Sequence, residues 1–63
     1  MENEIVKSPV FNIDMEVIAP IGTELTEGVI QDLANDGIDT IETYTGTLHI
    51  RYTPDFLYLH ITK

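Results

Sequence analysis

The chain has 63 residues and no cysteine, and its eleven acidic against three basic side chains give a formal net charge of −8. This balance excludes binding to nucleic acid through phosphate contacts, because such contacts require clusters of Lys and Arg. The lack of cysteine excludes disulfides and thiolate metal sites. A hydrophobic content of 43% is typical of a folded chain, so we expect one small domain with a thin core.

The N-terminal part of the sequence is polar. It lacks the basic region of a signal peptide, and no apolar run in the chain approaches the roughly 20 residues of a membrane-spanning helix, so we expect a cytoplasmic protein that does not bind membranes. Ser8-Pro9 interrupts regular strand pairing. We therefore expect residues 1–9 to be a loosely ordered arm, with at most a short edge strand at Ile5-Val6, and residues 10–63 to form the single domain.

Residues 10–18 alternate between apolar and polar side chains, with the polar ones at Asn12, Asp14 and Glu16. Such alternation predicts one half-buried strand. The apolar side chains expected to face the core are Phe11, Ile13, Met15 and Val17.

The next segment has the pattern of an amphipathic helix. Its apolar residues recur at spacings of three and four, as on one face of a helix. Thr26 is a suitable N-cap, and Leu25 before it can pack on Ile30 as a hydrophobic staple. Gly37 and Ile38 predict a Schellman stop. The helix is too short to be stable alone in water, so we expect it to lie on a sheet.

Two turns divide the C-terminal half into three strands. Glycine in the connection Thr45-Gly46 predicts a hairpin in which Tyr44 pairs with Thr47, so that Ile41 faces Ile50, Thr43 faces Leu48 and Glu42 faces His49. A second turn at residues 53–56 pairs Tyr52 with Leu57. That register sets Ile50 against Leu59 and Leu48 against Ile61.

These elements predict an α+β domain with the order β-α-β-β-β. One helix packs on a mostly antiparallel sheet that ends in a three-stranded meander. The first strand is expected on an edge, parallel to residues 38–44, because this arrangement is the right-handed crossover that short connections favour.

Residues 20–41 have the pattern Gly-Thr-x-Leu-Thr, a helix, and then Gly-Ile-x-x before a hydrophobic residue. This unit, about a third of the chain, resembles segments in the N-terminal regions of some HD-GYP phosphodiesterases and in the β′ subunit of bacterial RNA polymerase. The matched residues are a turn, a cap, a core face and a helix stop, and the sequence contains no His-Asp metal-binding pair. The resemblance implies a strand–helix–strand unit and carries no function with it.

The first candidate binding surface is acidic. Its carboxylates, with no Lys or Arg between them, predict a strongly negative helix face that binds a basic protein by mimicking the phosphates of nucleic acid. The alternative is a solvated face that keeps the protein soluble. The residues are Glu24, Glu27, Asp32, Asp36, Asp39 and Glu42.

The second candidate is the sheet face opposite the helix, where aromatic groups and an arginine resemble a protein-binding patch. The alternative is that the first strand, the arm or a second copy covers this face. Its two histidines are expected to be cross-strand neighbours, but two histidines, even with Glu42, favour no metal. The residues are Tyr44, His49, Arg51, Phe56, Tyr58 and His60.

No catalytic constellation is evident, since the only serine is Ser8 in the arm, and we expect neither an enzyme nor a cofactor. The leading hypothesis is a small acidic protein-binding module that inhibits or modulates a nucleic-acid-processing protein. It resembles in type the short acidic proteins that phages encode against host machinery. The alternative is a homo-oligomeric assembly or adaptor module that docks through the aromatic sheet face.

Overall fold

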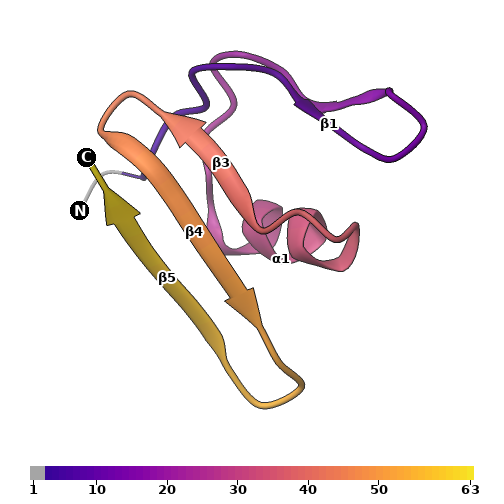
Figure 1. Ribbon diagram of the computed structural model, residues 1–63, viewed down its shortest axis with the longest axis vertical. Helices are drawn as coiled ribbons and strands as arrows, with labels where there is room; N and C mark the ends of the chain where they lie inside the picture. The colour runs from indigo at the N-terminus through magenta and orange to yellow at the C-terminus, as the bar shows by residue number, and fades with distance from the viewer. Residues whose placement is uncertain (1–2) are drawn as a thin grey trace.

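One helix and two antiparallel sheets make up the structure, a computed structural model that describes residues 3–63 (Figure 1). The predicted α+β class is confirmed. The order β-β-α-β-β-β has one strand more than the sequence predicts. The elements are β1 (Val10–Phe11), β2 (Val17–Ala19), α1 (Glu27–Asn35), β3 (Thr40–Thr43), β4 (Gly46–Tyr52) and β5 (Leu57–Thr62).

Helix α1 begins and ends as its sequence predicts. The hydroxyl of the N-cap Thr26 accepts a hydrogen bond from the Val29 amide at 3.3 Å. At the other end the Gly37 amide donates to the Ala34 carbonyl and the Ile38 amide to the Leu33 carbonyl, both at 3.0 Å. This pair of bonds, with Gly37 at a φ of +86°, is the Schellman motif. Both ends of the helix are therefore specified locally.

The meander β3-β4-β5 has one predicted register and one shifted register. Tyr52 pairs with Leu57 and Leu48 with Ile61, as predicted. Between β3 and β4, however, Thr43 pairs with Gly46 and Ile41 with Leu48, so the prediction that Ile41 faces Ile50 is wrong by two residues. An even shift keeps every side chain on its predicted face, because side chains alternate with a period of two.

Gly46 explains the shift. The sequence assigns it to the turn, but it is a strand residue with a φ of +142°, and a Cβ there would come within 2.5 Å of the Thr62 carbonyl oxygen on β5. The turn is instead Tyr44-Thr45, held by the Thr43 hydroxyl, which donates to the Gly46 carbonyl at 2.8 Å. Glycine is therefore needed here for close approach between strands.

The prediction of a single strand over residues 10–18 is wrong. Strands β1 and β2 pair with each other as a hairpin, Val10 opposite Ala19 and Phe11 opposite Val17, and neither joins the main sheet. The cause is the turn chemistry of Asn12 and Asp14, which reverses the chain midway through the alternating run. The predicted parallel pairing with residues 38–44 is consequently absent from residues 3–63.

The edge of β3 is occupied instead by residues assigned to the arm. Val6 is fully buried and forms an antiparallel bridge with Thr43. The Lys7 amide donates to the Glu42 carbonyl, and the Val6 amide donates to the Thr23 carbonyl, each at 2.9 Å. Through these contacts residues 5–7, which include the short edge strand expected at Ile5-Val6, tie the helix entry to β3.

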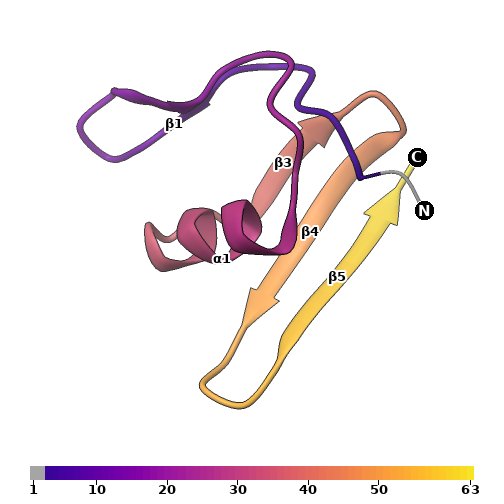
Figure 2. The same ribbon diagram turned by 180° about the vertical axis from the view of Figure 1, so that it is seen from behind.

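The core lies between α1 and one face of the meander. Figure 2 shows α1 on this face, whereas the opposite face, turned toward the viewer in Figure 1, carries no helix. In the part of the chain described, no helix has the length and apolar character needed to cross a membrane. The buried apolar residues are Val6, Val10, Ala19, Leu25, Ile30, Leu33, Ile41, Leu48 and Ile50.

Candidate functional site

The β1–β2 hairpin presents apolar side chains to solvent. Ile13 is 95% exposed and Met15 is 75% exposed, and Phe11 and Val17 at the hairpin sides are also exposed. We call these four residues the apolar tip. Their predicted contact with the core is wrong, because only Val10 and Ala19 at the base of the hairpin are buried. Clusters of exposed apolar side chains on a small soluble domain commonly mark binding sites.

The hairpin turn is well ordered by Asn12. Its side-chain oxygen accepts hydrogen bonds from the amides of Asp14 and Glu16, each at 2.9 Å. The Met15 amide donates to the Asn12 carbonyl at 3.0 Å, which closes a β-turn. Because these bonds hold the backbone, the tip presents its side chains in a defined arrangement.

Met15 occupies a backbone conformation that favours glycine. Its φ is +64°, whereas the other residues with positive φ in the described chain are all glycines. A non-glycine residue in this left-handed region costs about 1–2 kcal/mol. The hairpin therefore places a large apolar side chain at the position where folding alone would select glycine or asparagine.

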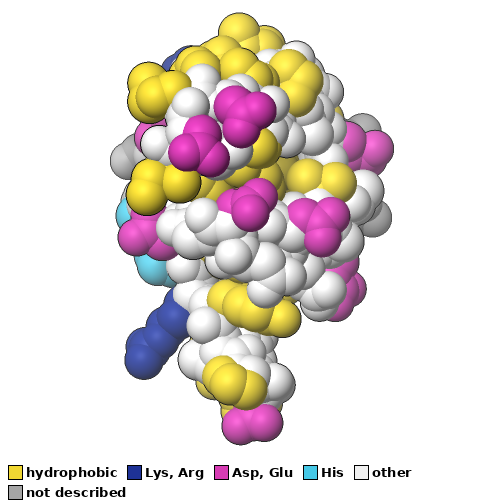
Figure 3. Space-filling view, turned by 90° about the vertical axis from the view of Figure 1, so that its right-hand side faces the viewer, with side chains coloured by type: hydrophobic (Ala, Val, Ile, Leu, Met, Phe, Trp, Pro, Cys, Tyr) yellow, Lys and Arg dark blue, Asp and Glu magenta, His cyan; other side chains and the backbone are white. Residues whose placement is uncertain are grey.

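Carboxylates flank the apolar tip. Asp14 and Glu16 are exposed within the turn, and Asp36 and Asp39 are exposed where the chain leaves α1. In Figure 1 the hairpin and the end of α1 lie on the same side of the molecule. Figure 3 views that side: carboxylates are spread among apolar side chains, and Lys or Arg side chains reach only its margins.

The predicted acidic surface is divided in the structure. All six of its residues are exposed, as a charged surface requires. Glu42, however, projects from the sheet face that α1 does not cover, because its neighbours Ile41 and Thr43 are buried toward the helix. Glu27 lines a groove beside β5, away from the helix exit at Asp36. The six carboxylates thus face several directions and do not form a single strip.

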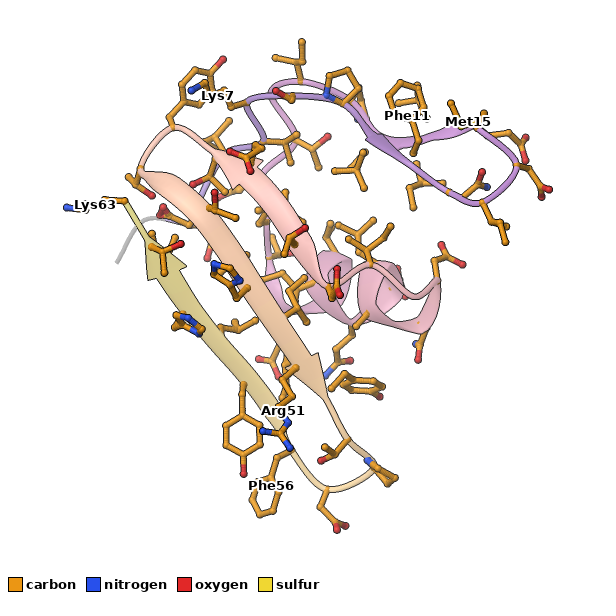
Figure 4. All side chains as sticks on the ribbon, in the orientation of Figure 1. Lys7, Phe11, Met15, Arg51, Phe56 and Lys63 are labelled. Atoms are coloured by element: carbon orange, nitrogen blue, oxygen red, sulfur yellow. The ribbon has the colours of Figure 1, made fainter. Side chains whose placement is uncertain are left out.

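The sheet face that α1 does not cover carries an open groove of about 490 Å³. It lies along β4 and β5, near the turn that joins these two strands. His49 and His60 pair across the strands, and their rings stack with centroids 4.6 Å apart. Figure 4 shows Arg51 and Phe56 at the same end of the hairpin formed by β4 and β5. The predicted residues that line the groove are His49, Arg51, Phe56, Tyr58 and His60.

Tyr44 does not belong to this groove. It lies in the β3–β4 turn, at the opposite end of the meander, beside Ile5. Glu42 is also displaced from the histidines: it lies opposite Thr47, whose hydroxyl donates to its carboxylate at 3.0 Å. Among residues 3–63 no three His, Cys, Asp or Glu side chains converge as a metal site would require.

Sequence reasoning missed the apolar tip although a signal was present. Asn12 and Asp14 are depleted in strands and enriched in turns, so their position inside an alternating run argues for a hairpin. The alternation of apolar and polar residues, taken alone, predicts a strand and hides this turn. No protein-family model, no curated protein and no solved structure matches this chain.

Proposed function

We propose that this protein is a small, non-enzymatic binding module that attaches to a basic surface of a nucleic-acid-handling protein and inhibits or modulates it. The observation that carries this proposal is the apolar tip, an ordered hairpin turn with Ile13 and Met15 exposed beside the carboxylates of Asp14 and Glu16. It has the composition of an interface centre, with apolar anchors surrounded by charged groups.

The apolar anchors contribute little to folding. Ile13 is 95% exposed, so truncating it removes almost no buried area. Met15 adopts a φ of +64°, which is unfavourable for its side chain. Residues that are strained or unburied in the free protein often have their role in recognition, which supports a partner with a complementary apolar pocket.

The carboxylates indicate the charge of the partner's surface. A net charge of −8 attracts a positively charged surface over long range, and the acids beside the tip select a pocket with a Lys- or Arg-rich rim. Such surfaces are characteristic of proteins that bind phosphate backbones. The bound protein would occupy part of the surface that nucleic acid uses, and the two ligands would compete.

The test is a capture experiment with the tagged chain, washed at increasing salt and followed by identification of the retained protein. We expect one nucleic-acid-handling protein that moderate salt releases. Met15→Gly should weaken its binding by about tenfold or more, since interface anchors contribute more than about 1 kcal/mol. Because glycine suits the backbone at this position, lost binding cannot be attributed to a lost fold.

A matched pair of variants tests the charge argument. Asp14→Asn should weaken binding, whereas Glu42→Gln, the same kind of neutralisation on the other face of the sheet, should leave binding unchanged. Excess nucleic acid should displace the protein from the identified partner. A ternary complex, or binding that resists both salt and Met15→Gly, would contradict the proposal.

A second candidate function is an adaptor or homo-oligomeric module that docks through the aromatic sheet face. The specific observation in its favour is the open groove, in which the rings of Phe56 and Tyr58 lie with centroids 5.7 Å apart beside Arg51. Tyr58→Ala would then abolish association while Met15→Gly leaves it intact. The opposite pattern would support binding through the apolar tip.

A further inference from the structure

Among residues 3–63, nothing pairs with the outer edge of β5. The other edge of the meander, on β3, is paired with the segment around Val6, but no residue of the described chain pairs with the outer side of β5. Figures 1 and 2 both show β5 as the outermost strand. An unpaired edge presents backbone donors and acceptors that another strand can use.

The register identifies which backbone groups point outward. The Ile50 amide donates to the Asp39 carbonyl at 2.8 Å, so the backbone of Ile50 is directed at the chain leading into β3. Its partner Leu59 must then direct its own N–H and C=O away from β4, because antiparallel pairs alternate between bonded and non-bonded. The same alternation turns the backbone groups of Leu57 and Ile61 outward.

This edge lacks the features that normally prevent association. Protected edges carry charges, prolines or bulges, whereas β5 has the sequence Leu-Tyr-Leu-His-Ile-Thr and pairs with β4 without irregularity. Leu59 is 44% exposed even though its side chain lies on the helix side of the sheet. It borders an apolar groove that is also lined by Leu25, Ile30, Leu57 and Ile61.

We propose that two copies of this chain associate through the outer edge of β5, in antiparallel register with Leu59 opposite the partner's Leu59. Leu57 then lies opposite the partner's Ile61, so the outward backbone groups of all three residues are paired in both copies. Each copy contributes a three-stranded sheet, and the two sheets become one. The inference is independent of the function proposed for the apolar tip.

Charge complementarity favours a second copy of this chain over a strand from a different protein. Asp55 lies in the turn before β5 and Lys63 follows β5, while the strand itself has no charged residue. In the register centred on Leu59, Lys63 lies beside the partner's Asp55 at both ends of the junction. A shift of two residues separates these charges and leaves outward groups unpaired. Lys63 also lies at the side of the molecule opposite the apolar tip, as the labels in Figure 4 show.

The side chains are compatible with this pairing on both faces. On the helix side, Leu59 contacts the partner's Leu59. These two side chains partly fill the apolar groove that each of them borders in its own copy. On the other side, Tyr58 lies opposite the partner's His60. A chain of 63 residues buries a small share of its surface on folding, so this junction supplies burial that one copy lacks.

Sedimentation equilibrium of the full chain over a concentration series tests the proposal. We expect a mass that rises from 7.1 kDa to twice that value. Lys63→Glu and Asp55→Lys should each weaken association about tenfold, because each converts two attractive pairs into repulsive ones. An equimolar mixture of the two variants should restore association. In the mixed dimer the two substituted side chains meet as one attractive pair, and the unchanged Asp55 of one copy meets the unchanged Lys63 of the other.

Amide hydrogen exchange provides a second measurement that does not depend on substitution. The amides of Leu57, Leu59 and Ile61 should become protected as protein concentration rises, whereas the already exposed amide of Ile13 should not change. A single-chain mass up to millimolar concentration would overturn the proposal. So would a dimer in which the Leu59 amide stays unprotected or the variant mixture fails to restore association, and such a dimer would point to the sheet face.

Discussion

The hairpin of β1 and β2 and the hairpin of β4 and β5 have similar sequence patterns. They differ in whether their apolar side chains are buried. Both alternate between apolar and polar residues, and both turns are held by side-chain hydrogen bonds. In β4 the alternating residues Leu48 and Ile50 are buried against α1. In the first hairpin the alternating residues Ile13 and Met15 are exposed.

The difference teaches that alternation assigns side chains to two faces without deciding which face is covered. Helix α1 has nine residues and covers one face of the meander. Val6 occupies the edge of the meander at β3, so no place remains there for residues 10–18. Within the described residues the hairpin is consequently buried only at its base, at Val10 and Ala19, and its apolar tip is exposed.

The largest expected effect comes from comparing one residue type in the two environments. Ile41 is almost fully buried on β3, and Ile41→Ala should destabilise the protein by about 2–5 kcal/mol, the range for large-to-small core substitutions. Ile13→Ala should change stability by less than about 0.5 kcal/mol. Urea unfolding of both variants measures the contrast, and similar losses would show that Ile13 is buried in solution.

Gly46→Ala should have the next largest effect. A Cβ at this position would come within 2.5 Å of the Thr62 carbonyl, on a backbone with φ +142°, so we expect a loss of about 1–3 kcal/mol. Gly22→Ala is the control, since its φ is also positive but nothing lies within 4 Å. Equal losses in thermal unfolding would contradict the close approach of β4 to the end of β5.

Asn12→Ala tests the order of the hairpin turn. The substitution removes the acceptor for the amides of Asp14 and Glu16, which should reduce stability by about 1 kcal/mol, as for a typical hydrogen-bonding side chain at a turn. Faster exchange of the amides of residues 14–16, with no change in β4, would locate the effect. Unchanged exchange there would mean that Asn12 does not hold the turn.

Met15→Gly should have an effect on stability close to zero, because two contributions oppose each other. Relief of the positive φ favours glycine, while the greater freedom of glycine in the unfolded chain opposes it, so the net change should lie within about 1 kcal/mol of zero. Calorimetric comparison with wild type gives the value. A larger loss would assign the Met15 side chain to folding and remove the main support for a recognition role.

Much of the fold was predictable wherever the determinants are close in sequence. Thr26 and Gly37 specify the ends of α1 by hydrogen bonds within a few residues, and the turn at residues 53–56 sets the register of β4 with β5. The register of β3 with β4 was not predictable from the turn, because Gly46 is constrained by Thr62, which is distant in sequence. Prediction was therefore weakest where two distant segments meet.

The candidate surfaces were also predictable where their determinants are close in sequence and not where distant segments meet. Exposure of the six predicted carboxylates follows from their charge, and five of the six sheet-face residues line one groove because they share a strand pair of predictable register. The prediction for Tyr44 was wrong because the β3–β4 turn is Tyr44-Thr45, which places this residue at the other end of the meander. The apolar tip was missed, because its exposure depends on which segment occupies the edge of β3.

The amino-acid sequence by itself determined the negative charge, the helix with both of its ends and the inward side of each strand in the meander. These depend on charge count, local hydrogen bonds and a period of two, which neighbouring residues suffice to set. Only the tertiary structure decided that Val6 would fill the edge of β3 and that residues 10–19 would fold back on themselves. Several segments can compete for one surface, and the packing of the whole chain selects among them.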